Sequence, residues 1–241
     1  MTSLLIALQF LTRLPVSLAA MPTPAQVGRS LLCYPLVGAL IGLLLLLVQP
    51  LLGDAPALLQ AALLLTLWVG LSGGLHLDGL ADSADAWIGG MGDRERTLSI
   101  MQDPRSGPMA VVVLVLLLLL KFVALVALLQ AGEGWQLLLV PWLARGLLPL
   151  LLLSTPYVRA GGLGQALVEH LPRRPLPWVL AGHLAALLLL GWPALLAVLV
   201  AGLLFLYLRG AMLRRLGGTT GDTAGAMLEL VECAVLVALA L

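Results

Sequence analysis

Long apolar runs are the feature that most constrains how this chain can fold. The chain is 61% hydrophobic with a mean hydropathy of +1.08. Charged residues make up 10% of it, against roughly 25% in soluble domains. Several runs are long enough to cross a hydrocarbon core about 30 Å thick. They lack the alternation of barrel strands, so the sequence predicts an all-α, polytopic membrane protein.

We expect about seven transmembrane helices. Three links between them are very short, whereas the connections at 76–107, 155–175 and 209–223 are long. The segment 176–208 is read as two short spans broken at Gly191-Trp192-Pro193, with one long kinked helix as the alternative. The predicted spans are 31–52, 56–75, 108–130, 135–154, 176–191, 193–208 and 224–241.

Basic residues predict the orientation in the membrane. All but two of the 13 Lys and Arg residues lie in the N-terminal segment or in the long connections, the exceptions being Lys121 and Arg145. The positive-inside rule therefore puts the N-terminus and the long connections in the cytoplasm and the C-terminus outside. No internal repeat is visible, so one integral membrane domain covering 1–241 is expected.

An acidic segment, His76-Leu77-Asp78-Gly79-Leu80-Ala81-Asp82-Ser83-Ala84-Asp85, follows the second predicted span. The spacing of Asp78, Asp82 and Asp85 puts all three carboxylates on one helical face. Like charges so placed repel one another unless a cation lies between them, and oxygen ligands favour Mg²⁺ or Mn²⁺. The alternative is a solvated helix start capped by Asp78. His76 is left open as a ligand, an acid–base group or a polar interfacial residue.

A loop rich in arginine comes next. Arg94, Arg96 and Arg105 follow the acidic face closely enough to act as phosphate clamps. Asp103 adds a further metal or base position. The alternative is an ordinary charged hydrophilic loop.

A third group precedes and enters the last predicted span. The run Gly217–Gly221, with Thr220, offers backbone N–H groups and hydroxyls to an anion. Asp222, Glu229 and Glu232 share a helical face, and carboxylates inside a membrane usually line a site. We therefore expect Glu229 to face a ligand, against the alternative of a flexible loop followed by a helix cap.

Two charges inside predicted spans need partners. Arg145 is expected to pair with a buried carboxylate, and Lys121 to have a structural role. The segment Tyr157 to Gly164, which includes Arg159, either closes over a ligand or forms an ordinary Gly-rich turn.

Carboxylates, arginines and a Gly-Thr loop at a membrane surface suit chemistry at a pyrophosphate. Metal ions held by carboxylates neutralise charge on phosphate oxygens, and arginines bind the non-bridging oxygens. An attacking hydroxyl needs a base, which one of the carboxylates can supply. The sequence contains no P-loop or dinucleotide fingerprint.

Several motifs in order resemble those of the cobalamin synthases, the adenosylcobinamide-GDP ribazoletransferases. The resemblance runs from near residue 5 to near residue 232. The matching segments are Leu8-Gln9-Phe10-Leu11-Thr12-Arg13-Leu14-Pro15, Tyr34-Pro35-Leu36-Val37-Gly38, Gly74 to Asp85, Arg96 to Gly107 and Gly218 to Ala226.

The resemblance implies a Mg²⁺-dependent, multi-pass enzyme of a bacterial inner membrane, with its active site facing the cytoplasm. It would join α-ribazole, or its 5′-phosphate, to adenosylcobinamide-GDP and release GMP, a late step of cobalamin biosynthesis. Its partners would be these small molecules and the bilayer, with no nucleic acid. Homo-oligomerisation and association with other enzymes of the pathway are left open.

The residues in these motifs then receive roles, with Asp82 as the preferred base. The catalytic residues are Asp82, Asp85, Asp78 and His76. The metal ligands are Asp78, Asp82, Asp85 and Asp222. The substrate-binding residues are Arg94, Arg96, Arg105, Asp103, Thr220, Glu229 and Arg159.

Three rival interpretations remain at this stage. A CDP-alcohol phosphotransferase would carry Asp-Gly-x-x-Ala-Arg, but Asp82 follows Ala81 here. A prenyltransferase would carry two Asn/Asp-rich motifs, which fits the Gly-Thr loop less well. A transporter would use the intramembrane charges as a path and show inverted repeats.

Overall fold

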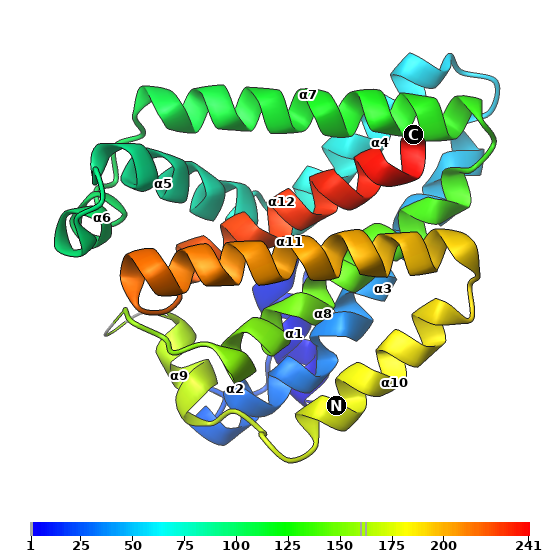
Figure 1. Cartoon of the computed structure of the whole chain (residues 1–241). Coiled ribbons are helices and arrows are strands. Elements are labelled where there is room, and N and C mark those ends of the chain that lie inside the picture. Colours follow the sequence, from blue (N-terminus) through cyan, green and yellow to red (C-terminus); the bar gives the residue numbers. More distant parts are fainter. Residues whose placement is uncertain (1, 160, 162) are drawn as a thin grey trace.

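The computed structural model describes residues 2–159, 161 and 163–241. Throughout this described part the chain is helical apart from its links, and the one pairing of extended backbone is an isolated bridge between Tyr157 and Thr219 (Figure 1). The all-α class is therefore confirmed. The helices are α1 (Thr2–Leu11), α2 (Pro24–Ser30), η1 (Leu31–Cys33), α3 (Tyr34–Val48), η2 (Gln49–Leu52), α4 (Ala57–Ser72), α5 (Leu75–Gly89), α6 (Arg94–Ile100), α7 (Pro108–Gln130), η3 (Gly134–Leu138), α8 (Leu139–Ser154), α9 (Leu163–Glu169), α10 (Leu176–Leu188), α11 (Trp192–Leu216) and α12 (Gly221–Ala240).

Five helical segments in the described part of the chain are long and apolar enough to cross a membrane, which supports the multi-pass prediction. α4 and α5 are long and apolar enough to cross a membrane only when taken together, and the chain bends by 87° at the break between them. α10, at 13 residues, is too short to count. The expected number of about seven is thus not reproduced, and the side of the N-terminus stays a prediction. The five spans are Pro24–Leu52, Pro108–Gln130, Gly134–Ser154, Trp192–Leu216 and Gly221–Ala240.

The break expected in 176–208 is present as two helices. Gly191 has a positive φ of 88°, which a glycine adopts without strain, and Pro193 lies in the first turn of α11. α11 then runs to Leu216, well beyond the predicted end at 208. Arg209 and Arg214 therefore lie on a helix rather than in a connection.

A sharp turn between α4 and α5 sets the direction of α5, the helix that carries the acidic residues. Gly73 and Gly74 both adopt left-handed backbone angles, with φ of 62° and 71°. Their N–H groups donate to the carbonyls of Gly70 and Val69, which closes the end of α4. The chain leaves at 87°, and α5 then packs against α7 and α12.

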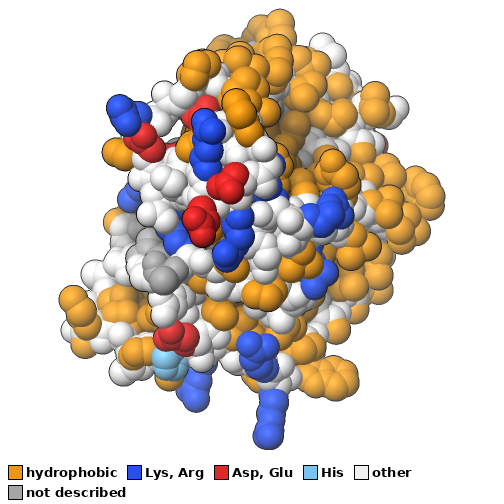
Figure 2. All heavy atoms as spheres, turned by 60° about the vertical axis from the view of Figure 1, so that its left-hand side comes forward, with side chains coloured by type: hydrophobic (Ala, Val, Ile, Leu, Met, Phe, Trp, Pro, Cys, Tyr) orange, Lys and Arg blue, Asp and Glu red, His pale blue; other side chains and the backbone are white. Residues whose placement is uncertain are grey.

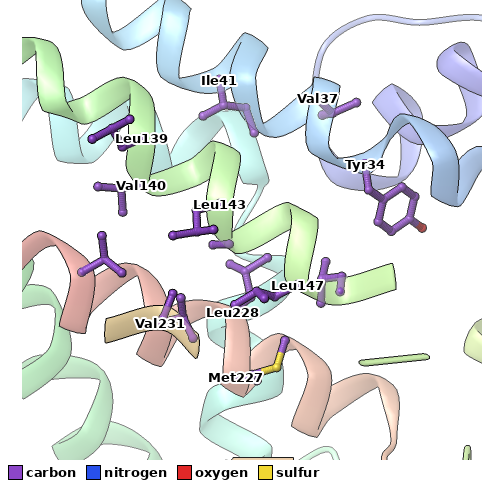
Figure 3. Close-up of a cluster of buried hydrophobic side chains, with 14 of the residues drawn as sticks. Tyr34, Val37, Ile41, Leu139, Val140, Leu143, Leu147, Met227, Leu228 and Val231 are labelled. Carbon is purple, nitrogen blue, oxygen red and sulfur yellow. The ribbon is translucent and has the colours of Figure 1, made fainter. Parts of the chain in front are cut away.

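Small residues let the apolar helices approach closely. A Cβ on Gly38 would overlap the carbonyl oxygen of Pro141, and one on Gly42 would lie 2.8 Å from the Cα of Leu138. These glycines, four residues apart on α3, face α8 as in other membrane helix pairs. Figure 3 shows the aliphatic cluster where α3, α8 and α12 meet, built from Val37, Ile41, Leu143, Leu147, Leu228 and Val231.

Most charged side chains outside the buried core lie at one end of the molecule. Figure 2 shows acidic and basic groups together on the face formed by the ends of α5, α6 and α9, flanked by a hydrophobic surface. The short links 53–56 and 189–191 lie at the other end (Figure 1). The bend after α4 brings the acidic helix towards the charged end.

The close α3–α8 contact predicts a marked difference between two glycine variants. Gly38→Ala should lower the free energy of unfolding by about 1–3 kcal/mol, because the added methyl group overpacks a backbone contact. Gly70→Ala is the control, since a Cβ there meets nothing within 4 Å. It should be neutral or slightly stabilising. Thermal unfolding in one detergent measures both, and an equal effect of the two variants would contradict the packing.

Candidate functional site

A cavity of about 410 Å³ lies where α5, α12 and the segment after α8 meet. This volume falls in the range of small-molecule sites, roughly 300–1,000 Å³. A separate apolar cavity of about 310 Å³ between α5, α7, α11 and α12 has no charged residue among its described lining. The polar side chains lining the first cavity are those of His76, Asp78, Tyr157, Arg159, Thr220 and Asp222.

The site depends on a very close approach of α5 to α12. A Cβ on Gly79 would lie 2.8 Å from the carbonyl oxygen of Asp222 and 3.0 Å from its Cα. One turn further into the bundle, a Cβ on Gly225 would lie 3.2 Å from the Cα of His76. A Cβ at Gly79 would force the backbones to shift, and one at Gly225 would make an unusually tight contact. This contact places Asp222 beside the acidic face of α5.

The three carboxylates of α5 lie on one helical face, as the spacing predicted. α5 by itself is too short to cross a membrane. Burial raises the pKa of Asp82, and the charges of Asp78 and Asp222 add to the rise. Arg159 opposes it and Asp85 contributes less, and the resulting pKa of Asp82 is about 6. The cluster therefore holds more negative charge than its protein partners neutralise.

Asp85 also has a structural role that the sequence did not reveal. One carboxylate oxygen accepts from the N–H of Gly107 at 2.5 Å, and the other accepts from the N–H of Ala110 at 3.0 Å. Asp85 thus caps the N-terminus of α7 from another helix. Its assignment as a metal ligand and catalytic residue stays a prediction.

Arg159 is brought to the site by a backbone bridge. The N–H of Val158 donates to the carbonyl of Thr219 at 2.9 Å, and the N–H of Thr219 donates to the carbonyl of Pro156 at 2.8 Å. The segment after α8 is thereby fixed to the loop before α12. Arg159 then pairs with Asp222 at 2.5 Å.

Thr220 is buried and begins α12. Its hydroxyl oxygen accepts from the N–H of Thr223 at 3.2 Å, and the hydroxyl of Thr223 accepts in return from the N–H of Thr220 at 2.9 Å. This capping box is the helix cap that the sequence allowed as an alternative. Thr220 also lines the cavity, so a substrate contact stays a prediction.

No residue of the arginine loop belongs to the described lining of the cavity. The Nε of Arg94 donates to the carbonyl of Leu216 at 2.7 Å and so caps the end of α11. Arg105 pairs with Asp103 at 2.8 Å on the surface, and it holds the pKa of Asp103 low, at about 2. Arg96 is exposed. Roles for these four residues in substrate binding stay predictions.

Glu229 does not face the cavity, contrary to the expectation from its helical face. Lys121 donates to Glu229 and to Glu232, each at 2.6 Å, and Arg145 pairs with Glu232. None of these four residues is more than 3% exposed. The ring of Trp68 lies 4.9 Å from the Nζ of Lys121. The network joins α7, α8 and α12, as expected for a structural Lys121 and a paired Arg145.

Four further residues that shape the site were not predicted from the sequence. Gly79 and Gly225 were overlooked because the contact they allow joins segments far apart in the chain. Gly221 and Gly225, four residues apart on one helix, were the available signal. Phe10 and Tyr34, which also line the cavity, come from α1 and α3 and carried no charge to draw attention.

A metal site is not preformed in the described residues. No three His, Cys, Asp or Glu side chains among them are arranged closely enough to hold an ion by themselves. The carboxylates of Asp78 and Asp222 nevertheless line one cavity, with Asp82 on the same face of α5 as Asp78. These donors suit a hard divalent cation that takes further oxygens from a ligand.

Comparison with known proteins gives a consistent result. The family model described as Cobalamin-5-phosphate synthase matches residues 3–240. A protein of Ectopseudomonas mendocina named adenosylcobinamide-GDP ribazoletransferase is 74% identical over 236 residues, 98% of this chain and 97% of that protein. Proteins of the same name from Pseudomonas aeruginosa UCBPP-PA14 and Stutzerimonas stutzeri are 70% and 66% identical, over 99% and 100% of this chain and 98% of each relative. No solved structure matches the chain.

The buried network predicts a large effect of removing its lysine. Lys121→Met leaves two buried carboxylates with one cation and should destabilise the protein by about 3–5 kcal/mol. The double variant Lys121→Met with Glu229→Gln restores the charge balance and should recover much of that loss. Unfolding in mixed micelles measures both. A single variant as stable as the unaltered protein would contradict the network.

Proposed function

The chain belongs to the Cobalamin-5-phosphate synthase family, and we propose that it transfers the phosphocobinamide group of adenosylcobinamide-GDP to α-ribazole or to α-ribazole 5′-phosphate. It is a transferase of the cobalamin synthase type. The products are adenosylcobalamin, or its 5′-phosphate, and GMP. The names of the relatives favour this reaction over transfer of the CDP-alcohol or prenyl type and over transport.

The observation that carries the proposal is the placing of Asp78 and Asp222 in one cavity with Arg159. The carboxylates come from two helices, and the arginine comes from a third segment fixed to the loop before α12. A pyrophosphate needs cations on its oxygens, which an arginine and a carboxylate-bound metal supply together. The charged cavity therefore suits the pyrophosphate of adenosylcobinamide-GDP.

We propose Mg²⁺ as the metal. Asp78, Asp82 and Asp222 supply the oxygen donors this ion prefers, and the excess negative charge of the cluster favours its binding. Bound there, Mg²⁺ would neutralise charge on the phosphate oxygens and stabilise the leaving GMP. The incomplete protein ligand set agrees with a site that the substrate's own oxygens complete.

The reaction is a substitution at phosphorus. The oxygen of the ribazole hydroxyl bonds to the phosphorus attached to the cobinamide arm, and the bond from that phosphorus to the oxygen of GMP breaks. We assign Asp82 as the group that accepts the hydroxyl proton, and Arg159 as the group that binds non-bridging phosphate oxygens. Thr220 and Gly221 at the start of α12 present a helix N-terminus to the same anion.

The site is proposed to face the cytoplasm of a bacterial inner membrane. The chain between α5 and α7 and the turn between α11 and α12 lie at one end of the molecule (Figure 1). Arg94, Arg96 and Arg105 belong to the first of these segments, whereas the links at the other end carry no Lys or Arg. The positive-inside rule then puts the charged end in the cytoplasm.

The proposed reaction is tested by GMP release from the purified protein in liposomes with adenosylcobinamide-GDP, α-ribazole 5′-phosphate and Mg²⁺. Asp82→Asn and Asp222→Asn should each lower the rate by about 10²-fold or more, because each removes a carboxylate from the reacting centre. EDTA should abolish turnover, and added Mg²⁺ should restore it.

Asp54→Asn is the matched control, since Asp54 is exposed in the link between η2 and α4, a segment at the opposite end of the molecule. It should keep full activity. No GMP release by the folded, unaltered protein would refute the reaction. Full activity of both site variants would refute the roles given to Asp82 and Asp222.

A further inference from the structure

A second cavity, of about 480 Å³, adjoins the charged one. The two cavities share Phe10, Tyr34, Gly161 and Leu167 in their linings. The two cavities are therefore neighbours, and a ligand held in the second lies next to the charged one. The second cavity is lined by residues of α1, α2, α3 and α9 and by Gly161, none of which belongs to the acidic motif.

The two cavities differ in charge. The described lining of the second contains no Asp, Glu, Lys or Arg. Its walls are aliphatic, from Ile6, Val27, Ala166 and Leu167, with the neutral polar side chains of Gln9, Ser30 and Tyr34 between them. Such a lining suits an uncharged group with little need for hydrogen bonds, and it does not suit a phosphate.

An aromatic pair forms one side of this cavity. The rings of Phe10 and Tyr34 are stacked, with centroids 6.2 Å apart and planes at 21°. A flat aromatic ligand can extend such a stack. The pair stands at the border between the two cavities and so orients a ligand relative to the charged site.

The hydroxyl of Tyr34 is a hydrogen-bond donor in need of a partner. Tyr34 is 2% exposed, and among the described residues its hydroxyl makes no hydrogen bond of normal geometry, although Ser30 lies near it. The hydroxyl of Ser30 donates instead to the carbonyl of Val27 at 2.6 Å. Figure 3 shows the Tyr34 hydroxyl pointing away from the labelled aliphatic side chains.

The part of the wall formed by α2 and α9 rests on a close backbone contact. A Cβ on Gly28 would overlap the carbonyl of His170, so α2 and the end of α9 are in backbone contact. This contact fixes Val27 relative to Ala166 and Leu167. The cavity is therefore shaped by packed helices, which favours a defined ligand over a loosely held one.

We propose that this second cavity binds the base of the ribazole substrate, with the ribose directed towards Asp78 and Arg159; the inference rests on the proposed function. Ribazole is a benzimidazole riboside. Its flat base has one nitrogen bonded to the sugar, one acceptor nitrogen and no donor, which matches the unpartnered Tyr34 hydroxyl in a largely apolar, aromatic-sided cavity. The guanine of the other substrate carries several donors and acceptors, which this lining would leave unpaired.

The test measures equilibrium binding of α-ribazole to the full chain in nanodiscs by calorimetry, together with the KM of each substrate. Tyr34→Phe keeps the ring and removes the donor, and it should weaken α-ribazole binding about three- to tenfold. The KM of adenosylcobinamide-GDP should not change. Tyr207→Phe is the control, since Tyr207 is exposed on α11 away from both cavities, and it should change neither value.

A substrate analogue makes the assignment specific. The corresponding indole riboside replaces the acceptor nitrogen by a C–H group. It should bind the unaltered protein more weakly than α-ribazole does, and it should bind Tyr34→Phe and the unaltered protein equally. This double cycle isolates the proposed hydrogen bond from any general effect of the variant.

A second variant tests the cavity by its volume. Ala166→Leu fills the wall and should weaken α-ribazole binding about tenfold or more, whereas Ala185→Leu on the exposed side of α10 should not. The inference is overturned if the unaltered protein does not bind α-ribazole. It is also overturned if the Tyr34 and Ala166 variants bind it normally, or if they change the KM of both substrates alike.

The binding result and the turnover result are separable. Binding that depends on Tyr34 and Ala166 without GMP release would support the cavity assignment and refute the reaction. GMP release, together with α-ribazole binding that is unchanged in the Tyr34 and Ala166 variants, would support the reaction and refute the cavity assignment.

Discussion

The backbone contact between α5 and α12 is the interaction on which the candidate site depends. Gly79 faces Asp222 and Gly225 faces His76, so the two helices approach closely, and a Cβ at Gly79 would lie 2.8 Å from the carbonyl oxygen of Asp222. Because α12 begins at this contact, its first carboxylate joins those of α5. The bend at Gly73 directs α5 to this place, and the cap from Asp85 to α7 secures its other end.

Two groups of charged side chains lie within a few turns of this contact, and they differ in how far their charges are balanced. Deep in the bundle, Glu229 and Glu232 are matched by Lys121 and Arg145, so the buried network carries no net charge. Buried charges are tolerated in this form because each has an opposite partner. Near the charged end, Arg159 is the one cation acting on Asp82 and Asp222 among the described residues. The first group holds α12 in place, and the second is left able to bind a cation.

Much of the helical framework could be predicted because it depends on local apolar composition. α7 coincides with the predicted span 108–130, and the acidic face of α5 follows from helical spacing alone. The length of α11 was missed, since its last two turns mix charged and apolar residues and resemble a loop.

The partner of each charge could not be predicted, because partners are chosen by tertiary contacts. Glu229 and Lys121 are 108 residues apart in sequence, and their pairing exists only once α7 and α12 are packed. Asp85 was assigned to a metal from its spacing, while its contacts with Gly107 and Ala110 arise from the way α7 begins. The uncharged second cavity left no pattern along the chain, since Phe10, Ser30 and Ala166 come from three helices.

The central claim is that α5 and α12 together form one cation site. A Mn²⁺ titration followed by electron paramagnetic resonance, with GDP present as the pyrophosphate, tests it most directly. Asp82→Asn and Asp222→Asn should each weaken Mn²⁺ binding by about tenfold or more, because loss of even an outer-shell partner of a metal lowers its affinity by about that factor. Asp54→Asn should leave binding unchanged. Normal binding by Asp222→Asn beside weakened binding by Asp82→Asn would contradict the account, because the site would then belong to α5 alone.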